Sequence, residues 1–482
     1  MDINFGSGLA GIGDVFLNRQ EENLQLLRGE ALSYRQQIWM VICLSIPAIL
    51  AEISSIVMQY IDAAMVGSLG KDATASIGLV TSTTWFVGGL CISAAMGFSV
   101  QVAQYIGAKE EAAARSVLRQ SLIVTAVFVL LLSLVCISIS GILPRWLGGT
   151  PGVCEGASRY FLVYACALPA VQFRQLGGSM LQCSGDMKTP SILNGFMCLL
   201  DVIFNFFLIF PTRTVEIGGV EVSVYGAGLG VTGAALGTAL AEAVTAVFML
   251  YMLCFRSETM QIMKKDRWTL NGSCLKKAVR IALPMAFEHG VLSGAQIVST
   301  KIVSPLGTVS VAANSLAVTA ESLCYMPGYG IAAAATTLVG QSIGAGRKEQ
   351  ARDFARLSVL LGAVMMTVTA VLMFVFAPTM FSMLTPDKAV QSLGVRVLRI
   401  EAFAEPLFAC SIVVAGALRG AGDTLVPSIM NLLSMWGIRI TMAAFLAPYI
   451  GLTGVWIAMC VELCIRGILF LIRLFREKWL GE

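Results

Sequence analysis

Two aspartates and one asparagine, each within an apolar segment, have the residue types and spacing of an ion-binding site. Asp201 and Asn205 are four residues apart, so on a helix their side chains project from one face. Asp62 lies in an earlier apolar segment of the same half of the chain, where we expect it to reach them. Two carboxylates and an amide oxygen suit a hard cation such as Na⁺, or a proton held by a carboxylate away from water. A buried hydrogen-bonded cluster that only braces the helices is the alternative.

Ionisable side chains also interrupt the apolar segments of the second half. A charge at the centre of a membrane helix costs roughly 2.5 to 3.5 kcal/mol on insertion scales, so we expect these side chains to face protein or water. Because most of them are acidic, they would attract cations, and we predict that they line a cleft for a cationic substrate. The predicted cleft residues are Glu288, His289, Glu321, Glu401 and Glu405.

Two prolines lie close to these acids. Pro327 and Pro406 are expected to kink their helices and to free backbone carbonyls beside the acidic side chains. Glu462 and Arg466 have a structural interpretation instead, because an acid four residues before a base on a helix favours an ion pair.

Enzymatic motifs are absent from the sequence. The Gly70–Lys71 pair is followed by Asp72 and lacks the upstream spacing of a phosphate-binding loop. A single histidine, His289, excludes a two-histidine zinc helix, and nothing places a nucleophile beside it. We therefore expect no enzyme, no catalytic residue and no cofactor other than a coupling ion.

The composition indicates a membrane protein. Of the 482 residues, 57% are hydrophobic and 13% are charged, whereas soluble domains have about 25% charged residues. From Ile38 onward, twelve apolar runs each approach the ~20 residues that cross a ~30 Å hydrocarbon core, the tenth and eleventh being 393–418 and 427–449. The sequence predicts an all-α polytopic membrane protein with twelve transmembrane helices.

Basic residues in the loops predict the orientation. Lysine and arginine are concentrated after the second, sixth, eighth and twelfth runs, all on one side, which is cytoplasmic by the positive-inside rule. Residues 1–36 lack a cleavable signal core, so we expect both termini in the cytoplasm and a multi-pass protein of the plasma membrane, the inner membrane in a bacterium. The predicted organisation is an N-terminal segment 1–36, a first lobe 37–254, a cytoplasmic linker 255–279, a second lobe 280–473 and a cytoplasmic tail 474–482.

The two halves of the chain are duplicates. The segment from Leu181 to Asn194 reappears as Leu418 to Asn431, with a shared Gly-Asp-x-x-x-Pro-Ser pattern at an offset of 237 residues. Six helices per half is an even number, so both halves enter the membrane in the same direction and form two pseudo-symmetric six-helix lobes. Beyond this segment the offset falls to 221, which indicates 16 extra residues in the first half, in the polar loop 212–226.

These motifs resemble the multidrug and toxic compound extrusion (MATE) transporters. The resemblance rests on Ile61 to Gly70, on the paired segments 104–108 and 341–345, and on the doubled Gly-Asp-x-x-x-Pro-Ser motif. The bacterial DinF-like branch of the family is the one that segments 326–330 and 336–341 resemble most. It implies a V-shaped cleft between the lobes and export of organic cations in exchange for Na⁺ or H⁺. Asp62 matches the family's helix 1 aspartate, whereas Asp201 and Asn205 stand in the reverse of the family's usual order.

We therefore predict a secondary active antiporter that exports organic cations or drugs in exchange for Na⁺ or H⁺ by alternating access. A lipid-linked oligosaccharide flippase of the same superfamily is the alternative, and it would favour a cationic cleft for phosphates; a channel or receptor fits the duplication less well. We expect small cationic substrates and the lipid bilayer as partners, no nucleic acid, and a monomer. The thirteen cysteines lack paired spacing and are interpreted as packing residues.

Overall fold

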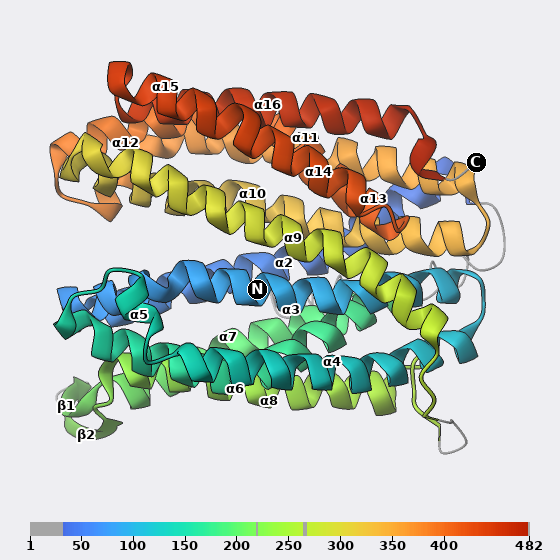
Figure 1. The fold of residues 1–482 in the computed structure, drawn as a ribbon, viewed down its shortest axis with the longest axis horizontal. Helices are drawn as coiled ribbons and strands as arrows, with labels where there is room; N and C mark the ends of the chain where they lie inside the picture. Colours follow the sequence, from blue (N-terminus) through green and yellow to red (C-terminus); the bar gives the residue numbers. More distant parts are fainter. Residues whose placement is uncertain (1–31, 218–219, 264–267, 481–482) are drawn as a thin grey trace, which may run out of the picture.

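The computed structural model describes residues 32–217, 220–263 and 268–480, and almost all of them are helical (Figure 1). Most of the predicted N-terminal segment, residues 1–31, lies outside the described residues. First-half helices fill one half of the molecule, and second-half helices fill the other.

The first half consists of six long helices and one short one. Their bounds are α2 Tyr34–Gly67, α3 Lys71–Gly107, α4 Glu111–Ile139, α5 Leu143–Trp146, α6 Pro151–Ser184, α7 Lys188–Ile209 and α8 Gly230–Tyr251, which continues as the π-helical turn η1 Met252–Arg256.

The second half repeats this order with two interrupted helices. Its elements are α9 Gly272–Val303, η2 Ser304–Leu306, α10 Thr308–Gly344, α11 Lys348–Leu384, α12 Lys388–Glu401, α13 Glu405–Gly420, α14 Leu425–Ser434, η3 Met435–Ile440, α15 Thr441–Ile450, α16 Leu452–Phe475 and η4 Lys478–Leu480. Since α12 with α13 and α14 with α15 each form one crossing, the described residues make twelve crossings, six per half. The predicted twelve-helix, two-lobe architecture is confirmed.

The tenth crossing is broken where the sequence predicts one kinked run, 393–418. Residues 402–404 leave the helix between α12 and α13, and Pro406 occupies the first turn of α13. Proline suits a helix start because its missing N–H needs no partner there. The break places Glu401 at the end of one helix and Glu405 at the start of the next. The eleventh crossing, predicted as 427–449, contains the π-helical segment η3.

The extra residues of the first half fold into a β-hairpin. Strand β1 spans Pro211–Ile217, strand β2 spans Val220–Ala227, and they pair antiparallel, with Pro211 opposite Ala227. The sequence predicts only a polar loop here. The hairpin projects from the end of the first half that also carries α5 (Figure 1).

The two halves pack against each other through their first two helices, which are α2 and α3 in the first half and α9 and α10 in the second. Helix α2 packs against α10, and the corresponding pair, α9 and α3, packs in the same way; α3 also contacts α10, its own counterpart. These helices occupy the middle of the molecule (Figure 1).

Gly107 and Gly344 are counterparts, and they lie where α3 and α10 end beside each other. A Cβ on Gly107 would be 1.9 Å from the backbone oxygen of Gln341, and a Cβ on Gly344 would be 1.8 Å from that of Gln104. No side chain fits into such a backbone contact, so only glycine permits this approach.

The same two glutamines tie each half to a helix end of the other. Gln104 Nε2 donates to the Gly420 carbonyl at 3.4 Å, and Gln341 Nε2 donates to the Cys183 carbonyl at 3.0 Å. Since Gly420 is the counterpart of Cys183, the two bonds are related by the repeat. The halves are therefore closed against each other where α3 and α10 terminate.

Candidate functional site

The three side chains predicted as an ion site meet between α2 and α7. Asp201 and Asn205 lie on one face of α7, and both are 0% exposed. The Asn205 amide nitrogen donates to Asp62 Oδ1 at 2.8 Å and to Asp201 Oδ2 at 3.0 Å. One neutral donor thus bridges two carboxylates from different helices. The geometry is that of a compact cluster, and its role as an ion or proton site stays a prediction.

Two oxygen atoms of this cluster accept no hydrogen bond from the described residues. They are Asp201 Oδ1 and Asn205 Oδ1, and both are buried. An unsatisfied buried polar atom costs about 1 to 3 kcal/mol. Carboxylate and amide oxygens are ligands for hard cations, and a proton would equally relieve the repulsion between two carboxylates that share one donor. The residues therefore fit either a monovalent cation or a proton.

Helix α8 closes the cluster through Gly237, which the sequence analysis did not single out. A Cβ on Gly237 would be 2.1 Å from Asn205 Oδ1, so any side chain there would displace the amide. The next residue, Thr238, lies beside Asp201. Gly233 and Gly237 are four residues apart, a spacing of small residues that allows helices in a membrane to approach closely, and this signal was present in the sequence.

An ion pair in the first half accounts for two other ionisable residues within its apolar runs. Arg174 on α6 pairs with Glu242 on α8, and the arginine also donates to Asn194 Oδ1 at 3.3 Å. Both charged side chains are largely buried, with 18% and 10% exposed. The pair joins α6, α7 and α8, which indicates a structural role.

Glu288 is fully paired. Its carboxylate accepts hydrogen bonds from Arg419 at 3.2 Å, from Ser428 Oγ at 2.8 Å and from Asn431 Nδ2 at 2.7 Å. Asn431 is the counterpart of Asn194, so the duplicated asparagine joins a buried ion pair in each half. This carboxylate ties α9 to α13 and α14, and its place in a substrate cleft stays a prediction.

His289 lies at the contact between the halves. A Cβ on Gly89 of α3 would be 2.5 Å from its imidazole Cγ. The only histidine of the chain therefore packs against the backbone of the opposite half.

The other three acids predicted for the cleft form a separate cluster inside the second half. One carboxylate oxygen from each of Glu321, Glu401 and Glu405 lies within 4.8 Å of the others. Glu401 and Glu405 are 0% exposed, and none of their four oxygens has a hydrogen-bond partner among the described residues. Burial disfavours ionisation of all three carboxylates at once. The positive charge of Arg439 acts on Glu321 and Glu401, and a bound proton or cation would compensate the rest of the charge. The structure thus divides the five predicted cleft residues into two groups.

The predicted ion pair between Glu462 and Arg466 is confirmed. Arg466 Nε lies 3.1 Å from Glu462 Oε1 within α16, and Ser434 Oγ donates to the same carboxylate at 2.5 Å. The pair braces α16 against α14.

Known proteins match this chain along most of its length. "Probable multidrug resistance protein NorM" of Thermotoga maritima is 28% identical over 445 residues, 91% of this chain and 92% of that protein. "Multidrug resistance protein MdtK" of Yersinia pestis is 25% identical over 462 residues, 92% of this chain and 95% of that protein.

Solved structures share the fold. A MOP superfamily transporter from Pyrococcus furiosus superposes with a TM-score of 0.86 at 21% identity, covering 95% of this chain and 99% of that one. An outward-facing multidrug resistance MATE family transporter superposes with a TM-score of 0.85 at 21% identity, covering 95% and 98%.

The MatE family model matches twice, once in each half, at residues 47–207 and 284–445. The two matches cover more than half of the chain and agree with the duplication read from the repeated motifs. The chain therefore belongs to the MatE family of multidrug and toxic compound extrusion transporters.

Proposed function

We propose that this protein is a secondary active antiporter that exports drugs or other organic cations in exchange for Na⁺ or H⁺ by alternating access. The observation that carries the proposal is the cluster of Asp62, Asp201 and Asn205, with two buried oxygens that accept no hydrogen bond from the described residues. The names of the relatives support drug extrusion as the direction of transport.

The driving energy follows from the coupling ion. Entry of one monovalent cation yields about 2.3 kcal/mol per 100 mV of membrane potential. A tenfold ion gradient adds about 1.4 kcal/mol. Exchange of one ion for a neutral substrate would therefore sustain a gradient of several hundredfold. If the substrate carries one positive charge, the electrical contribution cancels and the chemical gradient alone drives export.

A contact close to the ion cluster connects it to the other half. Tyr60, two residues before Asp62 on α2, donates from its hydroxyl to the Thr319 carbonyl of α10 at 2.5 Å. Thr319 is in turn two residues before Glu321, a member of the acidic cluster. A shift of α2 on ion binding would act on α10 through this bond, and coupling of this kind is what an exchange mechanism requires.

The finer assignments belong to the same proposal. We place the lobes at 37–254 and 280–473, joined by the linker 255–279, with both termini in the cytoplasm of a monomer in the inner membrane. The helical start of α9 at Gly272 makes the last part of this linker helical. The acids Glu321, Glu401 and Glu405 would attract a cationic substrate to the second lobe.

Drug accumulation in everted membrane vesicles tests the proposal, with a Na⁺ gradient and a pH gradient imposed separately. We expect transport to respond to one gradient and to lose that response in Asp62→Asn. Asp72→Asn, an exposed aspartate at the start of α3, is the matched control and should transport normally. Failure of the protein to respond to either gradient would contradict antiport and favour the flippase.

A further inference from the structure

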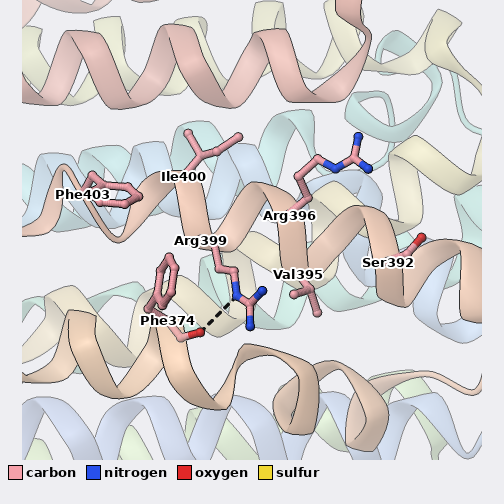
Figure 2. Close-up of a pocket in the computed structure, with 7 residues that line it drawn as sticks. All are labelled: Phe374, Ser392, Val395, Arg396, Arg399, Ile400 and Phe403. Atoms are coloured by element: carbon pink, nitrogen blue, oxygen red, sulfur yellow. Dashed lines mark hydrogen bonds between the residues drawn. The ribbon is translucent and has the colours of Figure 1, made fainter.

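A groove lies on the outside of the second half, between α11 and α12. It is open to the outside of the molecule and has a volume of about 400 Å³. Figure 2 shows the side chains that line it, which include two arginines, a serine and two phenylalanines. The groove takes no part in the ion cluster or in the acidic cluster described above.

The groove carries positive charge without an acidic partner among the described residues. Arg399 Nε donates to the Phe374 carbonyl at 3.2 Å, and its guanidinium lies 5.0 Å from the centre of the Phe374 ring (Figure 2). These contacts hold the arginine against α11 without neutralising its charge. Arg396, one turn away on the same helix, is exposed and extends away from α11.

Comparison with the first half shows that the groove lacks an acidic residue beside Arg396. At an offset of 237, Ser392 and Arg396 correspond to Glu155 and Arg159, which form an ion pair at 2.7 Å on α6. In the second half the glutamate is replaced by Ser392, so its arginine has lost the partner that the first half retains. Arg399 adds a second charge where the first half has a leucine.

Exposed apolar side chains lie near the groove on α11. Val371 and Val375, close to Phe374 in the sequence, are 56% and 59% exposed. Phe374 is ten residues before the end of α11 at Leu384, which corresponds to about 15 Å along the helix axis. The two arginines therefore lie among exposed apolar side chains, where an uncompensated charge is unfavourable unless an anion accompanies it.

One end of the groove is polar and the other is aromatic, as the headgroup and the acyl chains of a lipid would require. Ser392 is nearest to the start of α12, Arg396 and Arg399 follow, and Phe403 lies deepest, with its ring centroid 5.9 Å from that of Phe374. A headgroup would lie at the polar end, and an acyl chain would contact the two phenylalanine rings. Arginine suits phosphate oxygens because its planar donors match them in pairs.

We propose that this groove binds the phosphate of an anionic phospholipid. The lipid belongs to the leaflet on the side of the loop between α11 and α12, which is the extracytoplasmic leaflet in the orientation proposed above. The inference goes beyond antiport and does not depend on it, because it requires only that the chain spans a membrane.

Lipid titration of the purified protein in detergent, followed by native mass spectrometry, tests the proposal. The probes are phosphatidylglycerol, zwitterionic phosphatidylcholine and soluble glycerol phosphate. Each basic side chain near anionic lipid changes binding roughly fivefold, so the double variant Arg396→Gln with Arg399→Gln should bind phosphatidylglycerol about thirtyfold more weakly. Arg159→Gln, the counterpart whose arginine is already paired, should bind like the unmodified protein.

A second variant tests lipid binding without removing an arginine. Ser392→Glu restores the acid of the first half, so it should pair with Arg396 and weaken phosphatidylglycerol binding, while the thermal stability stays unchanged. Equal weakening by Arg159→Gln, or unchanged binding by Ser392→Glu, would overturn the proposal. Displacement of the lipid by glycerol phosphate at the same concentration would overturn the assignment to a membrane lipid.

Discussion

Replacement of Gly237 by alanine tests whether the first-half cluster holds the coupling ion. The new Cβ would be 2.1 Å from Asn205 Oδ1, whereas ordinary contacts begin near 3.4 Å. The amide must therefore move by more than 1 Å. Its hydrogen bonds to Asp62 and Asp201, now 2.8 and 3.0 Å, cannot both survive such a shift.

The expected effect is large because each of these bonds ends on a carboxylate. A hydrogen bond to a charged group contributes about 1.5 to 3 kcal/mol, so loss of at least one weakens the cluster by that amount. If this cluster binds the ion, its affinity should fall roughly tenfold to a hundredfold. The assay is the half-saturating concentration of Na⁺ or H⁺ for drug transport in everted vesicles.

The control is Gly195→Ala on α7, where an added Cβ meets nothing within 4 Å, and it should transport normally. A second variant separates coupling from folding: Asn205→Ala in the Gly237→Ala background removes the overlapping amide, so stability should partly recover while ion dependence stays impaired. An unchanged half-saturating concentration in Gly237→Ala would refute the assignment of the ion to this cluster.

Three stability predictions follow from other buried contacts. Glu288→Gln leaves the partly buried Arg419 of α13, 22% exposed, without its counter-charge and should lower the free energy of unfolding by about 3 kcal/mol. Glu155→Gln, in an exposed pair, should change it by less than about 1 kcal/mol in the same thermal assay. Glu405→Gln removes one of two unpaired buried carboxylates and should leave the unfolding temperature unchanged or raise it, so a decrease like that of Glu288→Gln would contradict our interpretation of the acidic cluster. Gly107→Ala would place a Cβ 1.9 Å from a backbone oxygen of α10, so we expect a lower unfolding temperature. The control is Gly141→Ala, whose Cβ would have nothing within 4 Å and should have no effect. Equal unfolding temperatures for the two variants would argue against the close contact between the halves.

The sequence predicts the membrane class, the twelve crossings and the duplication because these features do not depend on contacts between residues far apart in the chain. Hydrophobic length specifies a crossing whatever its neighbours are. The repeat is visible because both copies keep their glycine, aspartate and proline positions. Asp201 and Asn205 were accessible in the same way, since helical spacing alone places them on one face.

Helix breaks and the β-hairpin were harder to predict from the sequence, because they depend on competing interactions. Pro169 and Pro406 are counterparts, yet α6 continues through the first while the tenth crossing breaks before the second. The same residue type thus gives a continuous helix in one half and a break in the other. The hairpin of β1 and β2 likewise needed a structure, because its segment reads only as a polar insertion.

Tertiary structure alone decided which acids are paired. Glu288 and Glu321 look alike in sequence, as single acids within apolar runs, but Glu288 finds its partners on Ser428 and Asn431, about 140 residues away. Glu401 and Glu405 instead converge with Glu321 across the helix break, and the described residues offer those two no hydrogen-bond partner. The cost of a buried charge is fixed by the amino acid, whereas its compensation depends on which helices the fold brings beside it.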